Sequence, residues 1–130
     1  MSREDEIKAR LEKATKGPWY WNVNPSSKRV ELVNSKSDIV MDFVRWGMNG
    51  VTPRFNINGL MVKATEMLAN WPGRDHHERW AKRIVNPDAD LIANAPADID
   101  YLLAENARLR AENEELRKQN NDFWDTNQGV

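Results

Sequence analysis

The chain contains no cysteine among its 130 residues. This absence excludes disulfides, cysteine-ligated zinc, iron–sulfur clusters and thiol catalysis, and it favours a reducing, cytoplasmic setting. No apolar run approaches the ~18–20 residues that cross a bilayer, so we expect no membrane-spanning helix. The charged residues 1–6 are not followed by an apolar stretch, so they do not predict a secretory signal.

An excess of charge of one sign is also lacking, because 19 basic residues face 20 acidic ones. A protein that binds the nucleic-acid backbone normally carries a large positive excess, so this class is disfavoured. The near-neutrality hides an asymmetry. Residues 97–130 hold four basic and eight acidic side chains, a net of −4, whereas residues 1–96 hold 15 and 12, a net of +3. The sequence therefore predicts a mildly basic body followed by an acidic tail.

The hydrophobic pattern predicts an α+β fold with a small antiparallel β-sheet, an N-terminal helix and C-terminal helices. The N-terminal helix is indicated by apolar residues at helical spacing behind an acidic first turn. In chain order we expect a helix at 3–14, strands at 19–23, 29–33 and 39–46, a loop at 47–59 containing a short strand at 54–57, and helical segments at 62–70 and 75–85.

Two prolines organise the C-terminal part of the prediction. Asn86, Pro87 and Asp88 have the order typical of a helix start, with a capping residue, a proline at the first helical position and an acid in the first turn. Pro96 repeats that signal and predicts a corner at residues 94–96. The expected organisation is an α+β domain over 1–96, a coiled-coil helix over 97–124 and a disordered tail over 125–130.

A heptad repeat begins at Ile99. Its core d positions carry leucine or phenylalanine, and its a positions after Ile99 carry asparagine. Asparagine at a specifies register and a dimeric state at a cost in stability, and three in succession is a heavy cost. The residues expected to mediate dimerisation are Ile99, Leu102, Asn106, Leu109, Asn113 and Leu116, with Asn120 and Phe123 continuing the pattern.

Charges flanking this repeat favour a parallel arrangement. Glu105 and Glu112 occupy g positions, and in a parallel dimer they face Arg110 and Arg117 at the e positions of the other helix. A zipper of about three heptads is marginal alone, so we predict a homodimer held jointly by the zipper and the body. The alternative is an amphipathic helix packed on its own domain. A DNA-reading zipper is disfavoured, because acidic residues and Pro96 precede the repeat.

Signals for catalysis are weak. Adjacent histidines, here His76 and His77, point about 100° apart on a helix, so they do not form the i, i+4 pair typical of a metal site. Glu31 and Asp42 lie on predicted neighbouring strands and could face each other as an acid–base pair, but an exposed sheet face explains them equally well. We expect no catalytic residue, no metal and no cofactor.

The remaining feature is the abundance of tryptophan, six in the chain, with arginine recurring beside it. Indole rings stack on purines and guanidinium groups pair with phosphate, so this combination is compatible with a nucleotide-like ligand. The alternative is that a small domain needs tryptophan to fill its core. The candidate ligand-binding residues are Trp19, Trp21, Arg45, Trp46, Arg54, Arg74, His76, His77, Arg79 and Trp80.

Two motifs together resemble a set of small phage and prophage accessory proteins without an assigned activity. The first is Ala-Thr-Lys-Gly-Pro-Trp at residues 14–19, and the second is Asp-Ala-Asp-Leu-Ile-Ala-Asn-Ala-Pro at residues 88–96. Residues 73–77, ahead of Trp80, add to the likeness, which covers about a third of the chain. The long asparagine-rich zipper departs from many relatives, which end soon after the second motif.

The resemblance implies a cytoplasmic protein of an infected or lysogenic bacterium that acts by binding. One hypothesis is a non-enzymatic protein that binds and sequesters a nucleotide-like signal to counter host defence. The alternative is a dimeric adaptor or inhibitor that docks a host or phage protein. Neither hypothesis involves a membrane or sequence-specific DNA.

Overall fold

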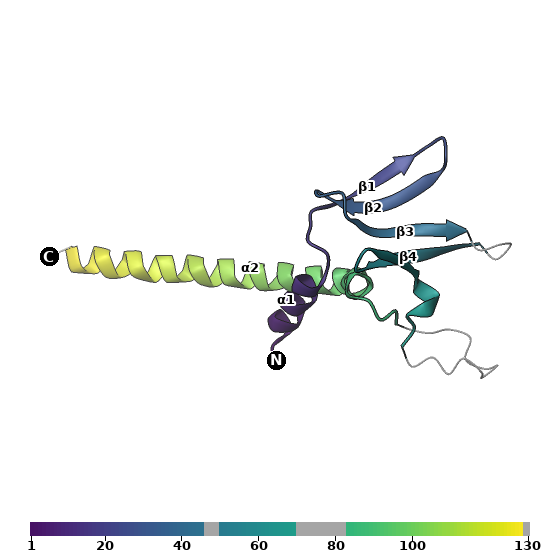
Figure 1. Cartoon of the computed structure of the whole chain (residues 1–130). Helices are drawn as coiled ribbons and strands as arrows, with labels where there is room; N and C mark the ends of the chain where they lie inside the picture. Colours follow the sequence, from purple (N-terminus) through teal and green to yellow (C-terminus); the bar gives the residue numbers. More distant parts are fainter. Residues whose placement is uncertain (46–49, 70–82, 129–130) are drawn as a thin grey trace. The chain divides into compact units, whose positions relative to one another are not determined.

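The expected α+β fold is confirmed by a computed structural model that describes residues 1–45, 50–69 and 83–128 (Figure 1). An N-terminal helix precedes five antiparallel strands, a short 3-10 helix and a long C-terminal helix. The elements are α1 (Arg3–Lys13), β1 (Trp19–Asn24), β2 (Arg29–Asn34), β3 (Ile39–Arg45), β4 (Val51–Ile57), β5 (Leu60–Lys63), η1 (Ala64–Glu66) and α2 (Pro87–Gln128).

Helix α1 begins where the acidic first turn predicts. The Ser2 hydroxyl accepts a hydrogen bond from the Asp5 amide at 3.1 Å, and the Asp5 carboxylate accepts one from the Ser2 amide at 3.3 Å. This reciprocal capping box satisfies two amide groups that have no partner within the helix. Ile7 is buried and Leu11 is exposed. The helix therefore packs through a narrow stripe.

The sheet is a meander in which each strand pairs with the next one in the chain. The hairpin of β1 and β2 has Trp21 opposite Leu32, and the register between β2 and β3 shifts between Leu32 and Val33. Directly opposite residues share a face of the sheet. One row across the five strands is therefore apolar and consists of Trp21, Leu32, Met41, Phe55 and Val62.

Two expectations for residues 47–70 were wrong. The segment 51–57 is a full strand rather than a loop with a short strand, and residues 60–63 form β5 rather than the start of a helix. The missed signal is Asn58-Gly59, whose positive φ angles of 53° and 91° suit the two-residue turn that joins Ile57 to Leu60. Residues 83–85 are not helical either, because Ile84 forms an isolated bridge with Leu68.

The core lies on the apolar face of the sheet. Phe55 is buried against Ala64 and against Ala89 in the first turn of α2, and Met41, Met67 and Ile84 pack around them. Small residues at 64 and 89 allow the 3-10 helix and the start of α2 to approach the sheet closely. The predicted start of α2 is confirmed, because the buried Asn86 side chain accepts hydrogen bonds from the amides of Asp88 and Ala89 at 2.9 and 3.1 Å.

A hydrogen-bonded cluster joins the segment after α1 to the start of α2. The buried Asp88 carboxylate accepts hydrogen bonds from the Thr15 amide at 2.6 Å and from the Thr15 hydroxyl at 2.7 Å. The Thr15 carbonyl in turn accepts the indole N–H of Trp19 at 3.0 Å, and the Asn34 side chain donates to the Lys16 carbonyl at 3.2 Å. Segments 73 residues apart in sequence are thereby tied together.

The expected break between two helices at residues 94–96 is not observed, because α2 is assigned as one continuous helix that includes Pro96. A proline inside a helix removes one backbone hydrogen bond, a cost of about 3 kcal/mol, but it does not prevent the helix from resuming. The helix also extends to Gln128, which corrects the disordered tail expected from residue 125. By internal contacts the chain divides into two units, Met1–Asn94 and Ala95–Val130.

Candidate functional site

The C-terminal unit presents an apolar seam along α2. The d-position side chains Leu102, Leu109, Leu116 and Phe123 are 42, 48, 54 and 61% exposed, and Ile99 at the first a position is 57% exposed. Residues spaced seven apart lie along one side of a helix and form the stripe by which coiled coils associate. Within one chain this stripe remains in contact with solvent.

Asparagine side chains interrupt the seam. Asn106, Asn113 and Asn120 are exposed along the same stripe, between successive d-position residues. An apolar surface that binds nonspecifically would not need polar groups at regular intervals. Asparagine at this position instead favours pairing with another asparagine across a helix interface, which sets the register.

Charged side chains flank the seam on both sides. Arg108 forms ion pairs with Glu105 and with Glu112, one turn before and one turn after it on α2. The hydrogen bond from Arg108 lowers the pKa of the Glu105 carboxyl group and the Coulombic attraction of the same pair adds to the effect, while burial opposes it. Arg108 therefore holds the side chains of both g-position glutamates beside the seam.

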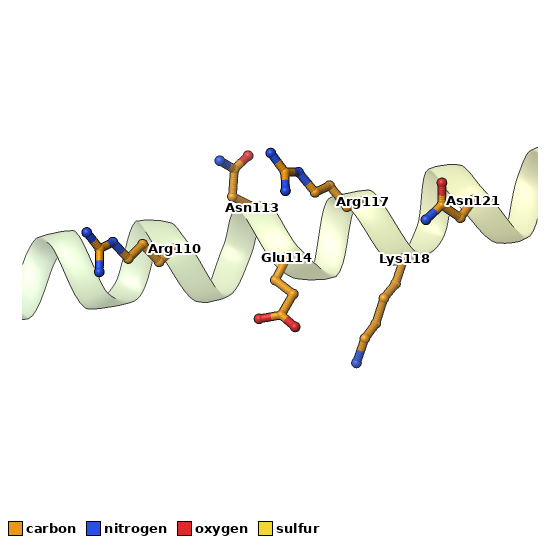
Figure 2. Close-up of a pocket in the computed structure, with 6 residues that line it drawn as sticks. All are labelled: Arg110, Asn113, Glu114, Arg117, Lys118 and Asn121. Atoms are coloured by element: carbon orange, nitrogen blue, oxygen red, sulfur yellow. The ribbon is translucent and has the colours of Figure 1, made fainter.

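The cationic e positions lie beside an asparagine of the seam. Figure 2 shows Asn113 and Arg117 projecting from one side of α2, while Glu114 and Lys118 project from the other. The hollow along these side chains has a volume of about 470 Å³. One helix supplies all of its walls, so it is an open surface hollow between side chains of α2.

The described residues of the predicted ligand set do not converge. Arg54 is engaged by the buried Asp42, to which its Nε and Nη2 donate at 2.8 and 2.6 Å. These hydrogen bonds raise the pKa of Arg54. The Trp19 indole N–H is bonded within the fold. Trp21 and Arg45 are exposed, and within the described segments no hydrogen bond or ring contact joins any two of these four residues.

The other candidates of that set lie outside the described residues: Trp46, Arg74, His76, His77, Arg79 and Trp80. Among the residues that the structure describes, no group of three or more acidic or histidine side chains is placed to hold a metal ion. None of the described helices has the length and apolarity needed to cross a bilayer.

A polar row crosses the face of the sheet opposite the core. Asn22, Glu31, Asp42, Arg54 and Lys63 are successive cross-strand neighbours from β1 to β5. The expectation that Glu31 and Asp42 could face each other is confirmed in register. Each carboxylate has its own partner, because Glu31 accepts from Asn22 at 2.9 Å and Asp42 binds Arg54. Asp42 and Arg54 are thus paired within the sheet, whereas Oε2 of Glu31 is buried without a hydrogen bond among the described residues and lies 3.3 Å from Arg29 Nη2.

No family model matches the chain, and neither the curated proteins nor the solved structures contain a match. The resemblance to phage accessory proteins therefore rests on the two sequence motifs alone.

Proposed function

We propose that the protein is a dimeric interaction adaptor, in which two copies of α2 form a parallel coiled coil and the α+β body docks a host or phage protein. The observation that carries the proposal is the exposed seam of Leu102, Leu109, Leu116 and Phe123. Burying a leucine side chain is worth about 1.5–3 kcal/mol, so a helix with this stripe gains from pairing.

The flanking charges support the parallel orientation. In a parallel pair Glu105 and Glu112 lie beside Arg110 and Arg117 of the other copy, whereas an antiparallel pair would bring g positions next to g positions. Like charges would then face each other. Arg108 already binds both glutamates within one helix, so the interchain pairs add to an existing charge network.

Exposed apolar side chains support a docking role for the body. Phe43, Val51 and Leu60, on three different strands, are 42, 64 and 68% exposed. Strand alternation and register place all three on the same face of the sheet as Met41, Phe55 and Val62, so one partner could cover them together.

Arg54 gives no support to a nucleotide-like ligand, while Arg45 is exposed and Arg74 and Arg79 lie outside the described residues. A phosphate group needs a guanidinium with free donors, and the Arg54 guanidinium is already held by a buried carboxylate through two hydrogen bonds. Sequestration of a signal to counter host defence stays a prediction. A panel of cyclic and linear nucleotides tested by thermal shift would support it if one of them raised the melting temperature.

Cysteine cross-linking of the full chain tests the parallel dimer, because the native chain has no cysteine. Asn106→Cys places one thiol at an a position, which meets its own copy in a parallel, in-register pair. We expect a disulfide-linked dimer on non-reducing electrophoresis. The matched control is Asn121→Cys, at a b position on the same helix, which should stay monomeric under the same conditions.

Sedimentation of a seam variant completes the test. Leu109→Glu introduces a charge at a central d position and should shift the full chain toward the monomer. An unchanged mass, together with failure of Asn106→Cys to cross-link, would overturn the proposal.

A further inference from the structure

The outer edge of β1 is the least protected strand edge of the sheet. Strand order places β1 and β5 at the two edges. β5 is four residues long and carries Lys63, whereas β1 is six residues long, Trp-Tyr-Trp-Asn-Val-Asn, with no charged residue and no proline. Proteins normally guard an edge strand with charge, proline or short length, because its free amide and carbonyl groups pair with other strands.

The side chains of β1 are also exposed. Tyr20, Trp21 and Val23 are 48, 59 and 54% exposed, on both faces of the strand. The apolar row of the sheet therefore ends in uncovered Trp21 beside the buried Leu32. An additional strand beside β1 would extend this row by one residue.

We propose that the β1 edge is a second dimer contact, at which β1 of one copy pairs antiparallel with β1 of the other. This inference rests on the proposed function, because it supplies the contribution of the body to the same dimer. A parallel coiled coil and an antiparallel pair of identical strands are both isologous, so each contact by itself is of the kind that closes a twofold dimer.

The sequence of β1 is complementary to itself. A twofold pairing centred on Asn22 brings Asn22 opposite the partner's Asn22, Trp21 opposite the partner's Val23 and Tyr20 opposite the partner's Asn24. Pairs of an aromatic with a β-branched residue are among the favourable cross-strand neighbours. No charged side chain lies on the strand, so two copies bring no like charges together along it.

The coiled coil alone is weak, so a second contact would stabilise the dimer, and association of the helices would in turn favour that second contact. Three a-position asparagines in a coiled coil of about three heptads leave the helix pair weak. Once the helices associate, the two β1 edges belong to one complex, so their pairing becomes an intramolecular step, which gains wherever the geometry lets the edges meet.

The test is a single cysteine on the proposed axis of the full chain. Directly opposite residues of antiparallel strands have Cα atoms about 4.5–5.5 Å apart, within the range of a disulfide. Under mild oxidation Asn22→Cys should form a covalent dimer. Leu60→Cys, exposed on the other edge strand, is the matched control and should stay monomeric.

The cross-linking results separate this inference from the proposed function. If Asn106→Cys cross-links and Asn22→Cys does not, or reacts no faster than Leu60→Cys, the edge contact is overturned and the coiled coil stands. If Asn22→Cys cross-links and Asn106→Cys does not, the edge contact stands and the coiled coil fails. If neither cysteine variant forms a covalent dimer, both the coiled coil and the edge contact are refuted. The β1 edge would then be available to pair with a strand of another protein.

A second variant guards against an effect of the cysteine on folding, because Asn22 also donates to Glu31. Val23→Lys places a charge on the exposed edge and should raise the dimer dissociation constant of the full chain at least ~10-fold, whereas Leu60→Lys should leave it unchanged. Sedimentation velocity measures both, and equal constants for the two variants would overturn the edge contact.

Discussion

Thr15 donates both its backbone amide and its hydroxyl group to the two carboxylate oxygens of Asp88, at 2.6 and 2.7 Å. These residues belong to the two motifs that carry the resemblance to phage proteins, one after α1 and the other at the start of α2. The motifs thus meet in one hydrogen-bonded cluster. Folding thus ties residues 14–19 to residues 88–96, since each segment supplies the hydrogen-bond partner of the other.

Replacement of Thr15 tests this cluster. Thr15→Val keeps the shape of the side chain but removes the hydroxyl donor, and it leaves one oxygen of the buried Asp88 carboxylate without that hydrogen bond. We expect a loss of about 1–3 kcal/mol in the free energy of unfolding, measured by urea denaturation. Thr65→Val, at an exposed position of η1, is the control and should change stability by less than ~0.5 kcal/mol. Equal losses in both variants would contradict the role of Thr15.

The Asp42–Arg54 pair predicts a non-additive effect on stability. Arg54→Met leaves the buried Asp42 carboxylate without its main partner and should destabilise the fold by about 2–4 kcal/mol. Adding Asp42→Leu removes the unpaired charge, so the double variant should recover most of that loss. A double-mutant cycle by chemical denaturation measures the coupling. Strict additivity of the two single effects would show that the pair contributes nothing specific.

The Glu105–Arg108 pair predicts a pH dependence. The pKa of Glu105 is lowered from its ordinary 4.5, chiefly by the hydrogen bond from Arg108. A lowered pKa in the folded helix means that the contribution of the pair is present above pH 4.5 and is lost as the pH falls through the lowered value. Carboxyl NMR titration should place Glu105 below 4.5 in the native chain. The same titration of Arg108→Gln should return it toward 4.5, and an unchanged pKa would contradict the pairing.

The asparagines of the seam predict a gain in self-association on substitution. Asn113→Ile replaces a polar a-position residue by an apolar one and should lower the dimer dissociation constant at least ~10-fold, with looser control of the oligomeric state. Asn121→Ile adds the same side chain at the outward-facing b position and is the control. Sedimentation equilibrium compares them. A similar change in both variants would mean that added apolar surface, rather than position in the seam, drives association.

Several elements were predictable because their signals are local. The N-terminal helix behind its acidic first turn, the Asn86-Pro87 helix start and the strands expected at 19–23 and 29–33 depend on neighbouring residues. The Asn58-Gly59 turn has the same character, and it identifies the hairpin that the expected loop and helix at 47–70 missed. The continuity of α2 through Pro96 could not be predicted from neighbouring residues. A proline occurs both at the first position of a new helix and at a kink inside a continuous one, and the local sequence does not distinguish the two.

In the candidate site, too, local features were predictable and long-range pairings were not. The spacing of Leu102, Leu109 and Leu116 follows from the helical repeat alone, so the sequence identified the seam without coordinates. The role of Arg54 could not be predicted from the sequence. Its pairing with Asp42 depends on strand register, a relation between residues 12 apart in the chain. The same holds for Trp19, whose indole N–H is bonded to Thr15.

By itself the sequence determined the absence of thiol chemistry, the separation of a basic body from an acidic helix, and the heptad seam. These properties follow from composition and from the short-range period of a helix. The tertiary structure decided that the motifs at residues 14–19 and 88–96 join through Thr15 and Asp88, that Arg54 serves the fold, and that β1 ends the sheet without protection. Each of these depends on which distant segments pack together, and that is set by burial and register over the whole chain.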